Sequence, residues 1–451
     1  MTVHSIKNAV VIGGGPAGLT AALAISKRPE VTEVTVVDSD NLSGGPTPRN
    51  GAPQGYHAHV LLGRGYEEMV RHAPNLQSRL LSQGATNIDF NNDTRVLLQN
   101  GWVAVTKSGI NTIVATRPLI EWAIRQEAKD NPKIRLLGSS EVHGIIQEGK
   151  SVRGIAIKSF GNQAQDLMCD LVVDASGRRS MASKWLSDGG FGEPEVEEIH
   201  LGVNYATRMY SIDKLKGKAW KVLAMNTIPP DMPRMGYLAR VEGGKYIVSL
   251  GGVGKEAPPV DNEGFLKFAR NLAHPAIYDA IKDAVPESGI HSFRFPGSRL
   301  YRYEKMADWP QNFVVVGDAY ASSNPFYGQG MTMGALHASA IDSTLKRHNN
   351  GNSFSRTAQA EIAKATRFSW TLATGEDNRW LQVATPWMTK MVQGYINRIL
   401  DTCPFSVGAT VGFCKVLHMD ANPSLLFTPK VVVPVVINSI LRRKPSNIMP
   451  N

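Results

Sequence analysis

Apolar runs separated by glycine and proline clusters predict alternating strands and helices in the first part of the chain. Residues 9–12 are a short apolar run that ends at a glycine cluster, and residues 34–37 are a second run rich in β-branched side chains. The segment between them, residues 19–26, is rich in alanine and leucine, which is typical of a helix. Residues 39–55 contain seven glycines and prolines, so a long loop is expected there.

The same reading extends along the rest of the chain and predicts an α/β fold in three parts. Helical periodicity is expected over residues 57–72, 117–127 and 329–346, and strand-like runs over residues 95–116, 134–173 and 313–316. Residues 195–300 alternate strand-like runs with two helical patches near residues 262–283, and the chain from residue 351 is mostly helical. We therefore expect a Rossmann-like nucleotide-binding domain from residues 1–190 and 290–350, an inserted β-rich substrate domain at residues 191–289, and a C-terminal helical extension at residues 351–451.

Composition and charge narrow the class of protein. With 451 residues, 42% of them hydrophobic and 20% charged, the chain has a globular composition. It lacks a secretory signal pattern and any apolar run of about 18 residues that could span a membrane. Three cysteines without paired or zinc-type spacing predict a reduced, cytoplasmic environment. The net charge of +10 suits phosphate-bearing cofactors, anionic membranes or nucleic acid, but no nucleic-acid-binding motif is present, so nucleic acid is not an expected partner.

A glycine-rich turn follows the first predicted strand. Gly13, Gly15 and Gly18 have the spacing of a dinucleotide-binding turn, which needs glycine for a tight bend, for close approach of a pyrophosphate and for helix–strand packing. The start of the next helix would add free N–H groups and a positive dipole end. Asp38 ends the next strand, where a carboxylate can accept hydrogen bonds from ribose hydroxyls. The expected cofactor-binding residues here are Gly13, Gly15, Pro16, Ala17, Gly18 and Asp38.

Two later segments decide between the possible dinucleotides. Asp174 begins a polar turn after a strand, and Gly317 and Asp318 follow another strand, with Pro325, Gly328 and Gly330 shortly after them. An extended flavin dinucleotide needs a second carboxylate for its second sugar chain and bare backbone N–H groups near the flavin ring. Asp318 and residues 328–331 offer these groups, so FAD is the expected cofactor.

These three motifs together resemble the FAD-dependent single-component monooxygenases of the p-hydroxybenzoate hydroxylase fold, over about residues 8–346. More narrowly, residues 53–59 and 324–332 resemble a bacterial subgroup of natural-product epoxidases and hydroxylases that includes polyether epoxidases. One departure is Ser176, which stands where the parent pattern has an Asp-Gly step. The resemblance implies that NAD(P)H reduces FAD, that O₂ adds to the flavin as a C4a-hydroperoxide, and that one oxygen atom passes to a small lipophilic substrate. It also implies cofactor contacts for Arg49, Arg117, Asp174, Gly317, Asp318, Pro325, Gly328, Gln329, Gly330 and Met331.

Four residues are candidates for direct roles in catalysis. His57 and His59 could handle protons near the flavin, because histidine titrates near neutrality. They lack further ligands for a metal, so no metal site is predicted; a covalent bond to flavin or simple helix capping are the other readings. Phe326 and Tyr327 adjoin the expected flavin loop and could wall an apolar pocket.

The function expected is hydroxylation or epoxidation of an aromatic, indole-like, polyene or terpenoid intermediate. A flavin-dependent reductase or dehydrogenase of prenyl chains and a non-catalytic FAD-binding protein are the alternatives. No Trp-x-Trp motif of flavin-dependent halogenases occurs. The C-terminal region is a candidate for peripheral membrane contact, because an apolar face around Trp387 and Met391 and an apolar segment at residues 429–441 precede the basic residues Arg442, Arg443 and Lys444. Docking of this region on the main domain is the favoured alternative.

Overall fold

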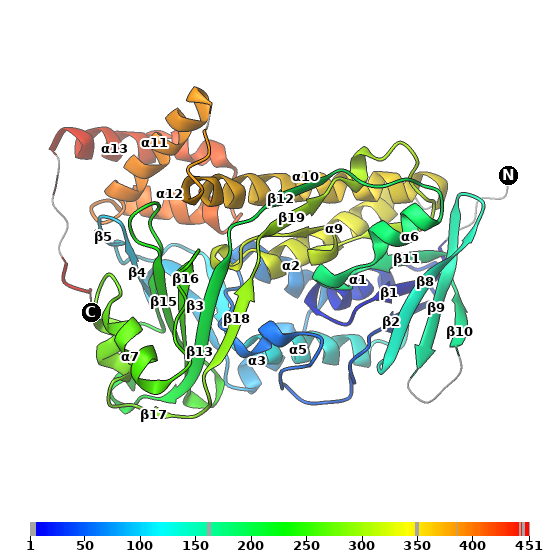
Figure 1. The fold of residues 1–451 in the computed structure, drawn as a ribbon, viewed down its shortest axis with the longest axis horizontal. Coiled ribbons are helices and arrows are strands. Elements are labelled where there is room, and N and C mark those ends of the chain that lie inside the picture. The colour runs from blue at the N-terminus through cyan, green and yellow to red at the C-terminus, as the bar shows by residue number, and fades with distance from the viewer. Residues whose placement is uncertain are drawn as a thin grey trace.

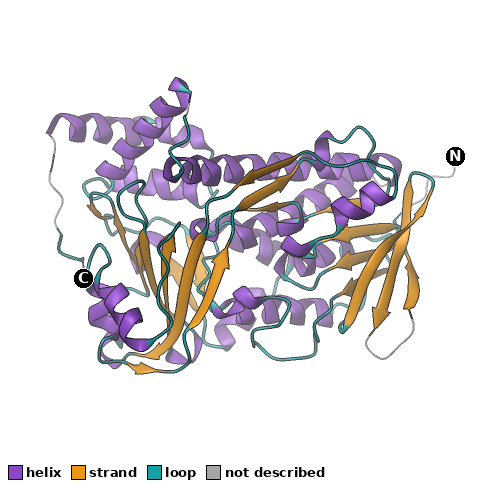
Figure 2. Cartoon of the chain, viewed as in Figure 1, coloured by secondary structure: helices purple, strands orange, loops and turns teal. Residues whose placement is uncertain are grey.

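The chain folds into two sheet-based regions joined by long helices, with a helical cluster at the C-terminal end (Figures 1 and 2). The computed structural model describes residues 6–159, 164–347, 351–384, 386–441, 443 and 447–450. The predicted α/β architecture is confirmed, including the Rossmann-like core, the β-rich region and the helical C-terminal extension.

A five-stranded parallel sheet forms the core of the first region, in the order β20-β11-β1-β2-β7. Its registers place Ile12 opposite both Val37 and Asp174, and Asp174 opposite Val315. The carboxyl ends of the strands therefore meet at one edge. The glycine-rich turn follows β1, Asp38 follows β2, the turn at Asp174 follows β11, and Gly317 and Asp318 come after β20 at this edge. The strands are β1 (Asn8–Ile12), β2 (Glu33–Val37), β7 (Ile134–Leu137), β11 (Leu171–Asp174) and β20 (Phe313–Val315).

The helices α1, α5 and α10 contact strands of this sheet, and so do the antiparallel strands β8 (Ser140–Glu148) and β9 (Ser151–Ser159). The first helix packs closely on a late one, α9 (Figure 1). An ideal Cβ on Gly334 would lie 2.7 Å from the Ala17 Cβ, so only glycine lets the two helices approach this closely there. The helices of this region are α1 (Pro16–Ser26), α2 (Gly63–His72), α3 (Leu76–Ser82), α4 (Phe90–Asp93), α5 (Arg117–Asp130), α6 (Ala182–Asp188), α9 (Gly330–Arg347) and α10 (Gly351–Trp380).

The second region is built on an eight-stranded sheet. It has the order β17-β13-β16-β15-β14-β4-β5, with β18 also paired to β13. Its strands are β4 (Thr94–Leu98), β5 (Gly101–Trp102), β13 (Val203–Ser211), β14 (Val222–Met225), β15 (Arg234–Arg240), β16 (Tyr246–Val253), β17 (Val285–Pro286) and β18 (His291–Phe295). Thus β4, β5 and β18 extend the sheet beyond the expected insert of residues 191–289.

The two faces of this sheet bury different residues, as the two-residue period of a strand requires. Ala206 and Tyr210 face the helices α7 (Asn262–Arg270) and α8 (Ala276–Ile281), together with Trp220 and Tyr246. Tyr205, Thr207 and Met209 alternate with them and face the Rossmann-like region. Of the aromatic residues in the insert, only those of the second face can approach the cofactor side.

Smaller sheets and the C-terminal helices complete the molecule. The remaining strands are β3 (Thr86–Asp89) with β6 (Asn111–Val114), the meander β8 (Ser140–Glu148), β9 (Ser151–Ser159) and β10 (Ala164–Met168), and β12 (Val196–Ile199) with β19 (Ser298–Tyr301) and β21 (Ala321–Ser322). The last helices are α11 (Trp387–Thr402), α12 (Val407–Leu417) and α13 (Pro429–Leu441), which pack on one another.

The helix expected over residues 57–72 begins only at Gly63, so this prediction is wrong at its start. Residues 57–62 are instead held against the β-rich sheet. The His57 Nδ1 lies 2.9 Å from the Thr207 Oγ1, and the Ala58 N–H donates to the Ser249 Oγ at 3.2 Å. These long-range contacts override the local periodicity and bring both candidate histidines toward the domain interface.

Buried histidines make stability depend on pH. Burial lowers the pKa of His57 and His72 to about 4, and of His337 and His418 to about 3. The unfolded chain therefore binds protons below about pH 6.5 that the folded chain refuses, and each such histidine lowers stability by up to about 2 kcal/mol by pH 5.

The variant His337→Gln tests this effect. In the protein, the His337 Nδ1 accepts from the Gly317 N–H at 2.9 Å and Nε2 lies 2.8 Å from the Thr366 Oγ1, and glutamine can offer an acceptor and a donor without titrating. In urea unfolding at several pH values, we expect the stability of the wild type relative to the variant to fall as the pH drops from about 7.5 to 5. A relative stability that does not change with pH contradicts the assignment of a buried, neutral His337.

Candidate functional site

The glycine-rich turn after β1 leaves open space in front of its middle glycine. An ideal Cβ on Gly13 would lie 2.5 Å from the Ala175 carbonyl oxygen, and one on Gly18 would lie 1.9 Å from the Gly13 carbonyl oxygen. A Cβ on Gly15, in contrast, would meet no atom within 4 Å. Pro16, which has no N–H, and Ala17 begin α1 directly after it, so the helix start with its free N–H groups lies next to this space.

The Asp38 carboxylate closes the turn from the end of β2. Its Oδ2 accepts a hydrogen bond from the Gly14 N–H at 2.6 Å, and its Oδ1 accepts from the Asp40 N–H at 2.8 Å. The Arg49 Nη1 donates to the same Oδ1 at 3.1 Å, and to the Asp40 Oδ2 at 3.0 Å. The Arg49 Nε contacts the Glu121 Oε1 at 2.5 Å. Arg49 therefore lies among three carboxylates at the end of β2; burial opposes its charge, but these carboxylates outweigh burial and raise its pKa.

Asp174 is fully buried and binds its own turn. Its Oδ1 accepts from the Ser176 N–H at 2.9 Å, and its Oδ2 accepts from the Ser180 hydroxyl. Burial raises its pKa, and the two serines oppose that shift. Both oxygens are thus engaged in holding residues 174–180, so this carboxylate supports the turn that contacts Gly13 rather than facing open space.

Asp318, in contrast, has a carboxylate available for a ligand. Within the described residues it makes no hydrogen bond or ion pair, and an ideal Cβ on Gly330 would lie 3.8 Å from its Oδ1. Burial raises its pKa, while Arg117 and Arg178 oppose that shift. Gly317 has a φ of +60°, and a Cβ there would clash with Ala17 at 2.9 Å, so the second motif meets the start of α1.

The start of α9 holds buried polar atoms without partners. Gln329 is only 1% exposed. Its side-chain Oε1 and Nε2 are both buried, and neither has a hydrogen-bond partner among the described residues. Gly330, the first residue of α9, is exposed, whereas Met331 packs in the core. Such unpaired buried amide groups are costly unless another molecule supplies partners. The helix start therefore fits a polar ligand that lies against it.

Arg117 joins the two histidines to this area from the first turn of α5. Its Nη1 lies 3.2 Å from the His59 Nε2, and its Nε has no hydrogen-bond partner and is 4.0 Å from the Glu121 Oε2. The His59 Nδ1 lies 2.9 Å from the His57 carbonyl oxygen. Since Arg117 only donates, His59 accepts at Nε2 and donates from Nδ1. Burial, and next the charge of Arg117, lower the pKa of His59 to about 3, so His59 is neutral at physiological pH.

The loop expected beneath the flavin is anchored by a residue of α10 that the sequence pattern did not single out. The Asp377 Oδ1 accepts from the Asn324 Nδ2 at 2.8 Å and from the Tyr327 hydroxyl at 2.9 Å, and its Oδ2 accepts from the Ser298 Oγ at 2.9 Å. Tyr327 is thus tied to α10. A signal existed in the sequence, because Asp377 continues the buried positions Thr366, Trp370 and Ala373 at helical spacing.

Phe326 points the other way, into an aromatic cluster on the β-rich sheet. Its ring centroid is 5.8 Å from that of Tyr205, which stacks on Phe293 at 5.6 Å and meets the His57 ring edge at 5.0 Å. An ideal Cβ on Gly251 would lie 2.7 Å from the Phe326 Cζ, so glycine makes room for the ring. Pro325 and Gly328 flank it, and Gly328 adopts a φ of +66° that favours glycine.

The geometry brings the three predicted motifs to one place and fits an extended dinucleotide. The open space at Gly15, the unpaired Asp318 carboxylate and the unpartnered Gln329 amide all lie along the carboxyl edge of the parallel sheet and the start of α9. Arg49, which is paired with three carboxylates, and Asp174, which is hydrogen-bonded within its own turn, lie beside this line. Among the described residues, no group of three or more His, Cys, Asp or Glu side chains could hold a metal ion.

Comparison with known proteins agrees with this site. Residues 8–186 match the FAD dependent oxidoreductase family. A curated relative, Protein Rv3254 of Mycobacterium tuberculosis, is 29% identical over 370 residues, which cover 80% of this chain and 77% of the relative.

Solved structures share the fold across nearly the whole chain at low sequence identity. The flavin-dependent brominase Bmp2 superposes with a TM-score of 0.65 at 14% identity, covering 96% of this chain and 98% of that one. The p-nitrophenol 4-monooxygenase PnpA of Pseudomonas putida gives 0.64 at 15% identity, covering 92% and 97%. A flavoprotein/dehydrogenase of Cytophaga hutchinsonii gives 0.67 at 14% identity, covering 98% and 100%. Residues 8–186 thus match a family of FAD-dependent oxidoreductases, and the chain as a whole has the fold of these flavoproteins.

Proposed function

We propose that this protein is an FAD-dependent monooxygenase that uses NAD(P)H and O₂ to hydroxylate or epoxidise a small lipophilic substrate. The observation that carries the proposal is the aromatic cluster of Tyr205, Phe293 and Phe326, because Phe326 belongs to the loop that connects Asp318 to the start of α9. Burial raises the pKa of the Tyr205 hydroxyl, and the charges of Arg117 and Asp318 shift it in opposite directions. An apolar wall at the cofactor is what oxygen transfer requires, because water must be kept from the reactive oxygen.

Different residues of the chain would hold different parts of the cofactor. The N–H groups around Gly15 and the start of α1 would bind the pyrophosphate, and Asp38 would accept from the adenosine ribose. Asp318 would accept from the second sugar chain, and the Gln329 amide and the N–H groups at the start of α9 would meet the flavin ring. FAD, when bound, supplies electron transfer and oxygen activation.

At neutral pH the two histidines would position neighbouring side chains, such as Arg117 and Thr207, rather than exchange protons. Burial lowers the pKa of His57 to about 4, and His59 is likewise neutral while it accepts from Arg117. His57 contacts Thr207, which in turn lies 2.5 Å from the Ser249 Oγ. The chain from Arg117 through His59 and His57 thus fixes the guanidinium at the cofactor side to the wall of the substrate region.

The lining favours an apolar substrate without charge, such as an aromatic, indole-like, polyene or terpenoid compound. Phe326, Tyr205, Phe293 and Met235 offer ring faces and a thioether. The absence of a Trp-x-Trp motif from the sequence speaks for oxygen transfer over halogenation. The narrower likeness to polyether epoxidases stays a prediction, as does the choice between NADH and NADPH.

The proposal is tested by following oxygen uptake, NAD(P)H oxidation and product together in the FAD-loaded protein with a panel of lipophilic candidates. We expect at least one candidate to speed flavin bleaching by NAD(P)H and to gain one oxygen atom from ¹⁸O₂. A product formed without oxygen incorporation would instead identify a reductase or dehydrogenase. Failure of NAD(P)H to bleach the flavin with any candidate would support a non-catalytic FAD-binding protein.

A further inference from the structure

The C-terminal helices expose an apolar face that their own packing does not cover. Their inward side chains, such as Ile399 of α11 and Val431 and Val435 of α13, are at most 3% exposed and pack with α12. The outward side chains are large, apolar and exposed, from 45% at Ile437 to 74% at Ile440. They form what we call the C-terminal apolar surface: Trp387, Met388, Met391 and Val392 of α11, Phe427, and Val433, Val436, Ile437, Ile440 and Leu441 of α13.

The spacing of these residues shows that the surface is a continuous face of each helix. On α13 the positions 433, 436, 437, 440 and 441 follow the helical period, as do 387, 388, 391 and 392 on α11. The two helices contact each other, and the start of α11 projects from the body of the molecule (Figure 1). One side of each helix is therefore packed in the molecule, as docking of this region requires. The other side of each helix has no partner among the described residues.

Charge indicates which partner covers this face. Residues 381–451 contain seven lysines and arginines but only two acidic residues. Lys390, Lys430 and Arg443 are exposed, whereas Arg442 and Lys444, the other members of the basic flank, lie outside the described residues. Basic side chains beside an apolar helical face are the pattern of helices that lie in the headgroup region of anionic bilayers.

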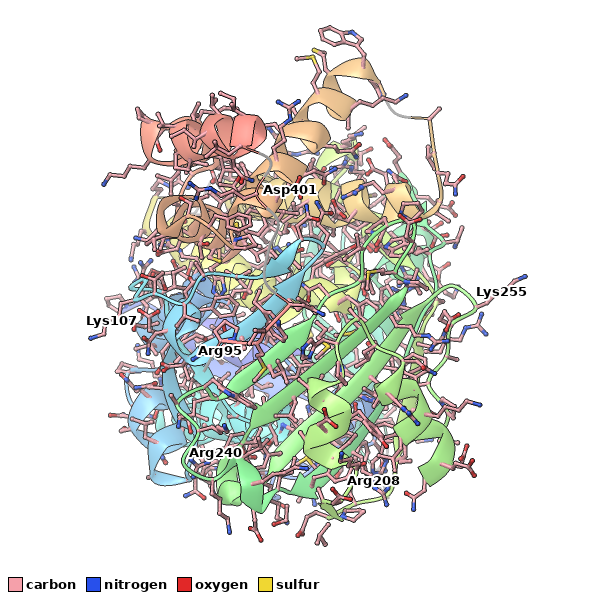
Figure 3. The ribbon with its side chains drawn as sticks, turned by 90° about the vertical axis from the view of Figure 1, so that its left-hand side faces the viewer. Arg95, Lys107, Arg208, Arg240, Lys255 and Asp401 are labelled. Atoms are coloured by element: carbon pink, nitrogen blue, oxygen red, sulfur yellow. The ribbon has the colours of Figure 1, made fainter. Side chains whose placement is uncertain are left out.

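In the part of the chain that the structure describes, neither of the two acidic residues forms an ion pair with Lys390, Lys430 or Arg443. The Asp401 carboxylate accepts from the Gln99 amide at 2.6 Å and from the Asn100 amide, and lies between these helices and the β-rich sheet (Figure 3). Asp420 pairs with Lys415 at 3.9 Å.

We propose that the C-terminal apolar surface docks the protein onto an anionic phospholipid bilayer. Trp387, Met391 and Ile440 would enter the boundary between headgroups and acyl chains, and Lys390, Lys430 and Arg443 would contact lipid phosphates. Attachment is peripheral, since none of the helices in the described ranges combines the length and hydropathy needed to cross a bilayer. The proposal rests on this surface alone and does not depend on the reaction catalysed.

A cavity lies near the same helices, between the proposed membrane-facing surface and the end of α10. A cavity of about 260 Å³ is lined by Pro229 and Pro230, by Asn378 and Arg379 at the end of α10, by Gln382 and Val383 just after it, and by Gln393 of α11. Trp380, between its lining residues in sequence, packs against the same core cluster as Phe326 and Tyr205. Docking through α11 would therefore bring the lipid phase next to the helix end that reaches the aromatic cluster.

The test is co-sedimentation of the purified full-length protein with vesicles of phosphatidylcholine alone or mixed with phosphatidylglycerol. We expect binding to the mixed vesicles that weakens with salt, and weak or no binding to phosphatidylcholine alone. The double variant Met391→Ser/Ile440→Ser should bind at least about tenfold more weakly, because it removes buried apolar area at the interface. The matched control is Val285→Ser, since Val285 is 63% exposed but lies on β17; it should bind like the wild type.

Three outcomes would overturn the proposal. They are no binding of the wild type to the mixed vesicles, equal binding of the double variant and the wild type, and a dimer in light scattering that the double variant dissociates while no form binds vesicles. The last outcome would assign the surface to contact between copies of the chain. All substituted side chains are exposed, so thermal unfolding midpoints close to that of the wild type are expected and exclude misfolding as a cause.

Discussion

Replacing Gly15 with valine is expected to leave the protein folded while weakening its affinity for FAD by about a hundredfold or more, the equivalent of losing about two charge-assisted hydrogen bonds. Gly15 has φ −81° and ψ 179°, a backbone conformation that any residue adopts, and its Cβ would meet no atom within 4 Å. The added side chain would therefore fill only the space in which the pyrophosphate approaches the backbone. Flavin fluorescence quenching measures the affinity, and urea unfolding of the FAD-free protein measures stability.

The control for this prediction lies three residues away. A Cβ on Gly18 would lie 1.9 Å from the Gly13 carbonyl oxygen, a backbone atom that cannot move aside. Gly18→Val should thus lower the free energy of unfolding by about 3 kcal/mol or more, even without FAD. If Gly15→Val binds FAD as tightly as the wild type, the open space at Gly15 is not the pyrophosphate site.

Replacing Asp377 with alanine is expected to destabilise the protein by about 3 kcal/mol or more and to uncouple NAD(P)H oxidation from product formation. The substitution removes the acceptor for three side-chain donors, those of Ser298, Asn324 and Tyr327, and leaves them buried without a partner. The loop that carries Phe326 would then lose its attachment to α10. Urea unfolding and the hydrogen peroxide released per NAD(P)H oxidised are the two measurements.

The neighbouring Glu376→Gln variant is the matched control. Glu376 pairs with Arg379 at 3.0 Å, and both side chains are partly exposed. Exposed pairs of this kind contribute little, so the variant should lose less than about 1 kcal/mol and stay coupled. Equal stability and coupling of Asp377→Ala and Glu376→Gln would show that Asp377 does not hold the loop.

The sequence predicted those parts of the fold that depend on residues close together along the chain. The strand, turn and helix at residues 8–26 and the acidic residue after β2 follow from a short apolar run, glycine spacing and β-branched composition, and the structure has them at the expected positions. Asp174 and Asp318 could be placed at the same edge because parallel strands align their carboxyl ends. The sequence could not show that Asp174 satisfies its own turn whereas Asp318 stays unpaired.

The parts that the sequence did not predict depend on contacts between distant segments. β4 and β5 join the β-rich sheet because β4 pairs with β14, more than a hundred residues later, and nothing in the local pattern specifies that pairing. Residues 57–62 are not helical, and Thr207 and Ser249 hold His57 and Ala58 against the β-rich sheet. Arg49 lies among Asp38, Asp40 and Glu121, an arrangement that only the folded chain assembles.

The central claim is that three distant motifs, represented by Gly15, Asp38 and Asp318, hold a single FAD molecule. The most direct measurement is the visible absorption spectrum of the protein after loading with FAD and gel filtration, with flavin and protein quantified in the same fraction. The account predicts one flavin per chain and the spectrum of an oxidised, bound flavin. A colourless protein fraction, with all the flavin eluting as free cofactor, would contradict it.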